Sequence, residues 1–174
     1  MASDERNATW LRLMEQYRGA LWRLVQSYEA DPGAREDLLQ EIALSLWQAI
    51  PRFRGDASER TWLYRIAHNV AISAGMSRRR RSSREVELPD SAQPASTAEL
   101  PDRALVRREQ REAMLAAIRE LPAIDRQLIV LHLEGLSGRE IEEISGMSEG
   151  AIHTRLSRIR GRLTAAVRGK ETWQ

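Results

Sequence analysis

The sequence contains no cysteine and few aromatic residues. The absence of cysteine excludes disulfide bonds and thiolate metal sites. Aromatic residues make up 5% of the 174 residues, which is typical of a mostly helical protein with modest hydrophobic cores. The N-terminus lacks the apolar segment of a signal peptide, and no apolar run approaches the roughly 18 residues of a transmembrane helix. We therefore expect a cytoplasmic protein that does not insert into a membrane.

Signatures of catalysis are also missing. The sequence has no phosphate-binding GxxxxGK loop, no HExxH pair and no GxSxG nucleophile turn. Its three histidines, His68, His132 and His153, stand far apart and lack the spacing of metal ligands. We expect no catalytic residue, no metal site and no cofactor, and we do not expect an enzyme.

The positive charges of the chain are clustered. The formal net charge is only +2, although 30% of the residues are charged. Arginines concentrate at 78–84 and again at 155–168. Local clusters of this kind attract a polyanion more effectively than the net charge suggests, which favours a nucleic acid as a partner.

Apolar periodicity predicts an all-α protein with two small helical domains. Helices are expected over 8–30, 34–50 and 59–80, with a break at Asp31-Pro32-Gly33. The segment 83–101 has no periodicity and contains prolines, small polar residues and acids, so it is interpreted as a flexible linker. The predicted division is a first domain at 1–82, the linker at 83–101 and a four-helix domain at 102–174.

Two helices have apolar sides that predict the core. The first is expected to bury Leu11, Met14, Leu21, Leu24, Val25 and Tyr28. The helix over 123–134 is expected to bury Leu128, Ile129, Leu131 and Leu133.

Residues 136–163 have the pattern of a helix-turn-helix. Ser137 and Glu140 have the spacing of a capping box, and Gly146 supplies the left-handed backbone that ends a helix. Ser148 is expected to cap the second helix. That helix has a buried stripe of Ile152, Leu156, Ile159 and Leu163. Its opposite side carries Thr154, Ser157 and Arg158, with Arg155 and Arg162 flanking that side and His153 flanking the other. This small, polar and basic face suits the major groove of DNA. An ordinary helical hairpin with a solvated basic face is the alternative.

Two further faces are candidates for binding. On the helix over 59–80, Trp62, Arg65 and Asn69 form a row that can stack on and hydrogen-bond to unpaired bases. Alternatively, Trp62 completes the core and the polar residues are solvated. On the helix over 34–50, the exposed face comprises Asp37, Gln40, Glu41 and Leu44. An apolar residue among acids and amides can mark a protein contact, and an ordinary solvated face with one exposed leucine is the alternative.

These motifs together resemble the extracytoplasmic-function subgroup of bacterial RNA polymerase sigma factors. EDLLQE at 36–41 is similar to the family's segment that docks on the polymerase. FRGDAS at 53–58 and TWLYRIAHN at 61–69 resemble its promoter-melting helix. EGLS at 134–137 and SEGAIHTRL at 148–156 resemble its second DNA-binding domain. The resemblance covers about 10–80 and 102–168.

The resemblance implies a role for each face. Core RNA polymerase would bind Asp37, Gln40, Glu41 and Leu44 through its β′ clamp helices, and its β flap would be a second partner surface. The minus-ten element, as single-stranded DNA, would contact Phe53, Arg54, Trp62, Tyr64, Arg65 and Asn69. Duplex phosphates would be held by Arg78, Arg79, Arg80 and Arg81, and the minus-thirty-five element would be read by His153, Thr154, Arg155, Ser157, Arg158 and Arg162. An anti-sigma factor is a possible further partner.

Three positions depart from the family's usual residues. Gly138 replaces an aromatic, Ala151 a threonine, and His153 a lysine or arginine. They bear on which minus-thirty-five sequence is read and not on the fold. The main alternative function is a stand-alone helix-turn-helix repressor or activator, which leaves the 53–80 face unused. A helical interaction module that does not bind DNA is a third possibility.

Overall fold

The structure is a computed structural model that describes residues 3–82 and 102–171. In these two ranges it consists of helices without strands, in the order α1 (Ser3–Tyr28), α2 (Pro32–Ala49), a 3₁₀ turn η1 (Ile50–Arg52), α3 (Glu59–Ser82), α4 (Asp102–Arg119), α5 (Ala123–Leu133), α6 (Gly138–Ser145) and α7 (Glu149–Glu171). The linker expected over 83–101 lies outside the described residues. None of the described helices combines the length and apolar character needed to cross a membrane.

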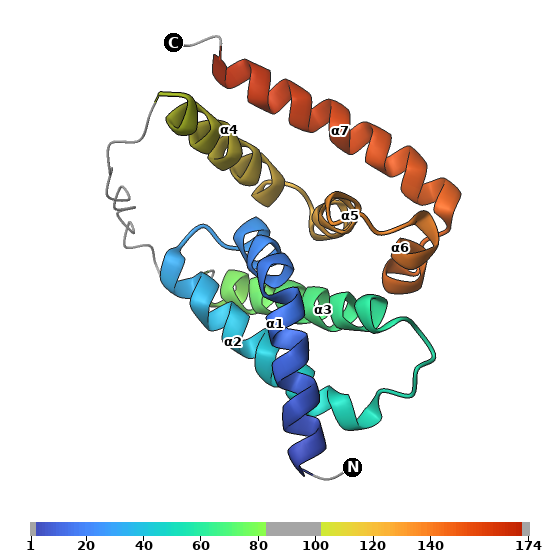
Figure 1. The fold of residues 1–174 in the computed structure, drawn as a ribbon. Helices are drawn as coiled ribbons and strands as arrows, with labels where there is room; N and C mark the ends of the chain where they lie inside the picture. The colour runs from blue at the N-terminus through green and yellow to red at the C-terminus, as the bar shows by residue number, and fades with distance from the viewer. Residues whose placement is uncertain (1–2, 83–101, 172–174) are drawn as a thin grey trace.

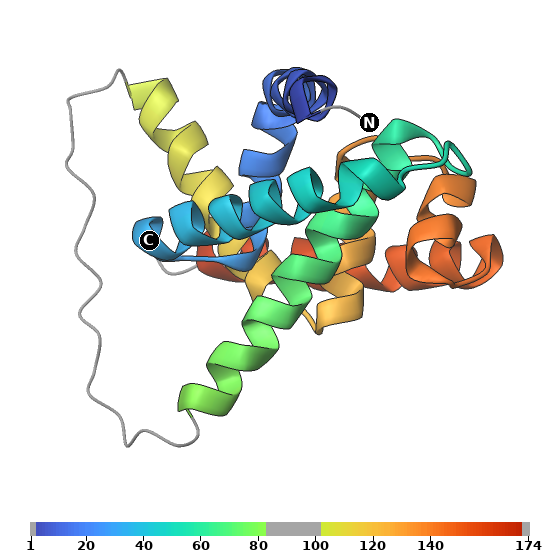
Figure 2. The same ribbon diagram turned by 90° about the horizontal axis from the view of Figure 1, so that it is seen from below.

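The helices form two groups (Figure 1). Helices α1, α2 and α3 pack on one another, and α5, α6 and α7 pack together with α4 lying along α7. Seen from below, α2 and α3 diverge from the turn that joins them, and α6 lies near the beginning of α3 (Figure 2). The all-α prediction is confirmed, and the two groups correspond to the two predicted helical units.

Local sequence signals explain where the helices begin and end. The Asp31 side chain accepts a hydrogen bond from the Ala34 backbone amide at 2.8 Å, so α2 begins at Pro32, inside the predicted break. Ser58 likewise accepts a hydrogen bond from the Thr61 amide at 3.0 Å and caps α3. The predicted capping box of Ser137 and Glu140 is confirmed, and Gly146 ends α6 with a φ of 72°.

Aliphatic side chains form the core, with two corrections to the prediction. Leu21, Leu24 and Val25 are buried as expected, but Leu11 is 61% exposed and Leu13 is buried at 1%. Leu11 faces a groove between α1 and α2 instead of the core. Leu133 is 63% exposed because it stands in the last turn of α5, beside a depression shared with α1 and α4.

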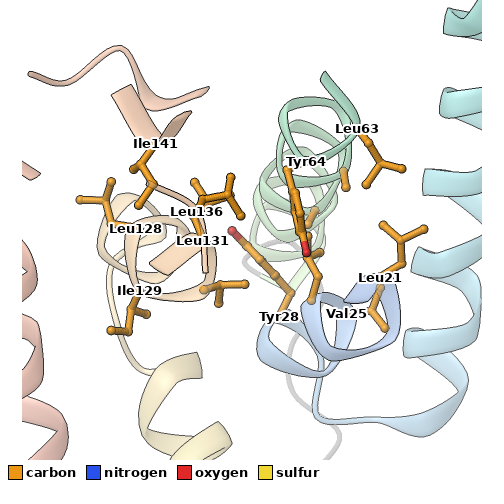
Figure 3. Close-up of a cluster of buried hydrophobic side chains, with 14 of the residues drawn as sticks. Leu21, Val25, Tyr28, Leu63, Tyr64, Leu128, Ile129, Leu131, Leu136 and Ile141 are labelled. Carbon is orange, nitrogen blue, oxygen red and sulfur yellow. The ribbon is translucent and has the colours of Figure 1, made fainter. Parts of the chain in front are cut away.

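The buried side chains of the two domains form one continuous cluster. Tyr28 and Tyr64 lie between the α1–α3 side of the cluster and Leu131 and Leu136 from the second domain (Figure 3). Tyr28 also contacts the guanidinium of Arg126, which lies 5.2 Å from the centre of its ring. The domains therefore share apolar contacts in addition to polar ones.

Candidate functional site

The predicted DNA-reading face of α7 is exposed. Ile152, Leu156, Ile159 and Leu163 are all buried, which confirms the predicted stripe. The opposite side presents His153, Thr154, Ser157, Arg158 and Arg162 to solvent. Within the described ranges, the side chain of Arg158 has no ion-pair or hydrogen-bond partner. The face therefore has the exposure that direct contact with base edges requires.

Arg155 and Arg162 differ from Arg158 because both face Asp125 of α5. The Arg155 Nε forms an ion pair with one carboxylate oxygen of Asp125, and Arg162 Nη1 lies 3.6 Å from the other. The Asp125 side chain is 10% exposed, whereas those of Arg155 and Arg162 are 33% and 59% exposed. These contacts join α7 to α5, a structural role that the sequence reasoning missed. The sequence feature that could have indicated this role is the acidic residue Asp125 in the first turn of α5.

The predicted single-stranded-DNA row of α3 is only partly accessible. Trp62 is half-buried and stacks at a tilt on Phe53, with ring centroids 4.8 Å apart. Asn69 and Arg54 are exposed. The Arg65 guanidinium donates a hydrogen bond to the Glu143 carbonyl of α6 at 2.9 Å. Part of the row is therefore exposed, but Arg65 is hydrogen-bonded to the second domain.

Tyr64 differs from the other predicted minus-ten residues because it is buried. It is 1% exposed, and its hydroxyl donates a hydrogen bond to the Glu134 carboxylate at 3.0 Å. Burial and the neighbouring carboxylate raise the pKa of Tyr64. In this arrangement of the domains Tyr64 is not accessible to DNA.

His68 lies beneath the same row. Its side chain is fully buried, and Nδ1 lies 2.9 Å from the Tyr28 hydroxyl. Burial lowers the pKa of His68 to about 3, so the ring is neutral at ordinary pH. The motif histidine therefore helps to support α3 from inside and does not reach the surface.

The arginines at the end of α3 are in different environments. Arg78 forms an ion pair with Glu29 at the end of α1, and burial raises the pKa of that carboxyl. Arg79 and Arg80 are exposed. The side chain of Arg81 lies outside the described part of the chain.

The predicted polymerase face of α2 borders an apolar groove. Asp37, Gln40, Glu41 and Leu44 are all exposed. The groove has a volume of about 610 Å³ and is lined by Asn7, Trp10, Leu11, Gln40, Ala43, Leu44 and Trp47. The Trp10 indole donates to the Ala43 carbonyl and the Trp47 indole to the Asn7 side chain, each at 3.0 Å. The contribution of α1 was missed because Leu11 had been assigned to the core.

Two family models match this chain. A family model described as Sigma-70 region 2 matches residues 13–84, and one described as Sigma-70 region 4 matches residues 111–163. The first covers the proposed docking face and α3, and the second covers the helix-turn-helix.

Curated relatives match most of the chain. The RNA polymerase sigma-H factor of Pseudomonas aeruginosa is 28% identical over 162 residues, which are 89% of this chain and 84% of the relative. The ECF RNA polymerase sigma-E factor of Escherichia coli K12 is 31% identical over 155 residues, which are 85% of this chain and 81% of the relative. These alignments extend well beyond a single helix-turn-helix.

Solved structures share the fold. CnrH in complex with the cytosolic domain of CnrY matches with a TM-score of 0.65 and 21% identity, covering 94% of this chain and 90% of that one. The sigma factor RpoE in complex with the anti-sigma factor NepR from Bartonella quintana matches with a TM-score of 0.70 and 23% identity, covering 92% and 97%. From the family models and the sigma-E relatives together, this chain belongs to the extracytoplasmic-function sigma factors of bacterial RNA polymerase, which direct the initiation of transcription.

Proposed function

We propose that this sigma factor divides promoter recognition between its two domains. The supporting observation is that one chain carries an exposed polar and basic face on α7 and a row of aromatic, basic and amide side chains on α3. The first suits duplex DNA and the second suits unpaired bases. A repressor with a single helix-turn-helix has no use for the second.

The second domain positions the factor on the minus-thirty-five element. Arg158, Thr154 and Ser157 contact base edges, with His153 at the border of the face. Arg155 and Arg162 contact the DNA backbone or the bases from the side of this face. Both arginines also face Asp125, so a DNA contact must share or replace these interactions. A bidentate arginine contact with a guanine discriminates against other bases by about 1–3 kcal/mol.

The first domain holds the melted strand. Trp62, Arg65 and Asn69 bind the non-template strand, and Phe53 and Arg54 contact a base that is flipped toward the turn at 53–59. A contact of Tyr64 with this base requires that its hydroxyl first leaves the Glu134 carboxylate. Unstacking a base costs a few kcal/mol, which base contacts and polymerase binding must offset. Arginines 78–81 bind duplex phosphates without reading sequence. The protein performs no chemistry of its own and is not an enzyme.

Polymerase docks on α2. Asp37, Gln40, Glu41 and Leu44 contact the β′ clamp helices, and the second domain contacts the β flap. The factor acts in the cytoplasm, where the polymerase is. An anti-sigma factor is a further candidate partner, to be sought by co-purification.

Transcription in a purified system tests the function. The protein, added to core polymerase and a library of genomic fragments, is expected to produce run-off transcripts from a specific set of promoters.

Charge reversal at Asp37 and Glu41 should weaken polymerase binding while the helical circular-dichroism signal stays unchanged, since both residues are exposed. If the wild-type protein binds DNA tightly without polymerase but never supports a transcript, it is a repressor or an activator instead.

A further inference from the structure

A polar depression lies at the C-terminal end of α2, beside the beginning of α1. It has a volume of about 390 Å³ and is lined by Arg6, Ser45, Trp47, Gln48, Ala49 and Arg52. Ser45, Gln48 and Arg52 follow one another at helical spacing along α2 and η1, and Arg6 comes from the first two turns of α1. The depression therefore brings hydrogen-bond donors of two helices to one place.

Trp47 holds the first of the two arginines. Its indole donates a hydrogen bond to the Asn7 side chain at 3.0 Å, and the Arg6 guanidinium lies over its ring, with Cζ 3.5 Å from the ring centre. The donors of a guanidinium lie in its own plane, so stacking on an aromatic face leaves them free for another partner. Within the described residues, the buried Nε of Arg6 has no hydrogen-bond partner. Arg6 is thus positioned without using this donor.

No acid neutralises the arginines of the depression. Elsewhere in the first domain, Arg12 and Arg78 each form an ion pair with a glutamate. Across the part of the chain that the structure describes, Arg6 and Arg52 form none, and the two acids in the first turn of α1 do not line the depression. Both positive charges are therefore available to an anion that enters it.

The arrangement of donors favours a phosphate group over a carboxylate. Ser45 and Gln48 add a hydroxyl and an amide to the two guanidiniums, so the donors come from both walls of the depression. The oxygens of a phosphate point in several directions, whereas those of a carboxylate lie in one plane. The partial positive charge at the beginning of α1 favours an anion and the partial negative charge at the end of α2 opposes it, so the two arginines determine the preference.

We propose that Arg6, Ser45, Gln48 and Arg52 form a binding site for a phosphate group. Two sources can supply this group. One is the backbone of single-stranded DNA, because Arg52 directly precedes Phe53 and Arg54, which are assigned to a flipped base. This source rests on the proposed function. The other is a free phosphorylated small molecule, which does not depend on the proposed function.

Inorganic pyrophosphate is the probe for the site itself. Titrated into the full chain, it should shift the NMR signal of the Trp47 indole N–H in a saturable way, and sodium chloride at equal ionic strength should not. Arg6→Gln and Arg52→Gln should each weaken pyrophosphate binding by about tenfold, the effect of losing one charge-assisted contact. Arg18→Gln, which removes an exposed arginine from α1, should leave the affinity unchanged.

Further variants separate binding from effects on the fold. Arg52 is exposed, so Arg52→Gln should keep the wild-type circular-dichroism spectrum and thermal unfolding. If Arg6→Gln fails to fold because it loses the contact with Trp47, Arg52→Gln provides the test. Arg52→Lys keeps the charge without the planar fork and should recover only part of the affinity. The absence of a saturable shift in wild type, or equal affinities in wild type and Arg52→Gln, would overturn the site.

The salt dependence of DNA binding identifies the source of the phosphate. A fluorescent random-sequence single-stranded 20-mer is titrated with wild type, Arg52→Gln and Arg18→Gln at several salt concentrations. If the strand supplies the phosphate, Arg52→Gln alone should make the plot of log affinity against log salt less steep by about 0.7, the value for one contact on a single strand. An unchanged slope, together with pyrophosphate binding that Arg52→Gln weakens, assigns the site to a free phosphorylated molecule.

Failure of this site and failure of the proposed function give different results. The pyrophosphate titration needs neither a promoter nor transcription, whereas run-off transcription by the wild type tests the proposed function without reference to Arg6 or Arg52. A factor that supports transcripts but does not bind pyrophosphate would lack the site and keep the function.

Discussion

At the scale of single residues, Arg158 is the side chain that we propose for base contact in the minus-thirty-five element. Its exposed guanidinium has no partner within the described residues, so it can bind a base without breaking an existing contact. Arg158→Ala should cost about 1–3 kcal/mol of promoter binding and relax selectivity at one position. A promoter library in a run-off assay measures both. Arg18→Ala, which removes an exposed arginine from α1, is the matched control.

A different pattern would assign Arg158 to phosphate. In that case the variant would weaken binding equally for all promoters, and the salt dependence of binding would become less steep. The two outcomes differ for any promoter sequence, so the measurement does not require that sequence in advance.

His68 makes stability depend on pH. Its folded pKa is about 3, against 6.5 for the ordinary side chain, so the unfolded chain binds a proton more readily between these values. The stabilisation is complete above pH 6.5 and is lost as pH falls toward 3, at up to about 1.4 kcal/mol per pH unit. Urea unfolding between pH 5 and 6.5 should show this slope, and His68→Gln should reduce it.

The exposed histidine of α7 provides the control for that measurement. His153→Gln should unfold with the wild-type pH dependence, because the His153 side chain is exposed. An equal slope in wild type and His68→Gln would show that other groups, such as the carboxyls, account for the loss of stability in acid.

At the scale of elements, the orientation of α7 depends on α5 through Asp125. Asp125→Asn and Arg155→Gln should each lower the free energy of unfolding by roughly 1–3 kcal/mol, since each breaks a partly buried charged contact. Their effects should not add, because they remove the same pair. Arg158→Gln should leave the unfolding free energy unchanged. Full additivity of Asp125→Asn and Arg155→Gln would mean that the pair does not connect the two helices.

The apolar groove between α1 and α2 should contribute to docking. Leu11 and Leu44 are 61% and 56% exposed, so shortening them removes little core packing. Leu11→Ala and Leu44→Ala should each weaken core-polymerase binding by about 1 kcal/mol or more while unfolding stays close to wild type. Leu105→Ala in α4, at 38% exposure, is a control outside the groove. Wild-type affinity in both variants would confine docking to the charged residues of α2.

At the scale of the whole molecule, the sequence predicts the helices well and their mutual contacts poorly. Ser137, Glu140 and Gly146 have local roles, so their pattern is sufficient to predict the boundaries of α6. Leu11 is exposed although it was expected in the core, and Tyr64 is buried although it was assigned to a DNA-binding face, because exposure depends on which helices lie beside a residue. Helical periodicity gives one buried face, but it does not show that the second domain covers part of α3 or that α2 leaves Leu11 uncovered.

Glu134 also shows that local structure is easier to predict from the sequence than a contact between distant residues. Its position before a helix-ending glycine is local information, and Gly135 has the expected positive φ of 76°. Its carboxylate accepts hydrogen bonds from Arg23 of α1, which is 111 residues away along the chain, and no periodicity relates the two residues. An acid at a helix C-terminus is nevertheless a usable signal, because it predicts that a distant cation must lie nearby.

The ion pair of Arg23 with Glu134 joins α1 to the end of α5. Because each of the two helical units supplies one member of this pair, a change at either residue removes a partner from the other unit. Among homologous factors, substitutions at these two positions are therefore expected to occur together and not independently.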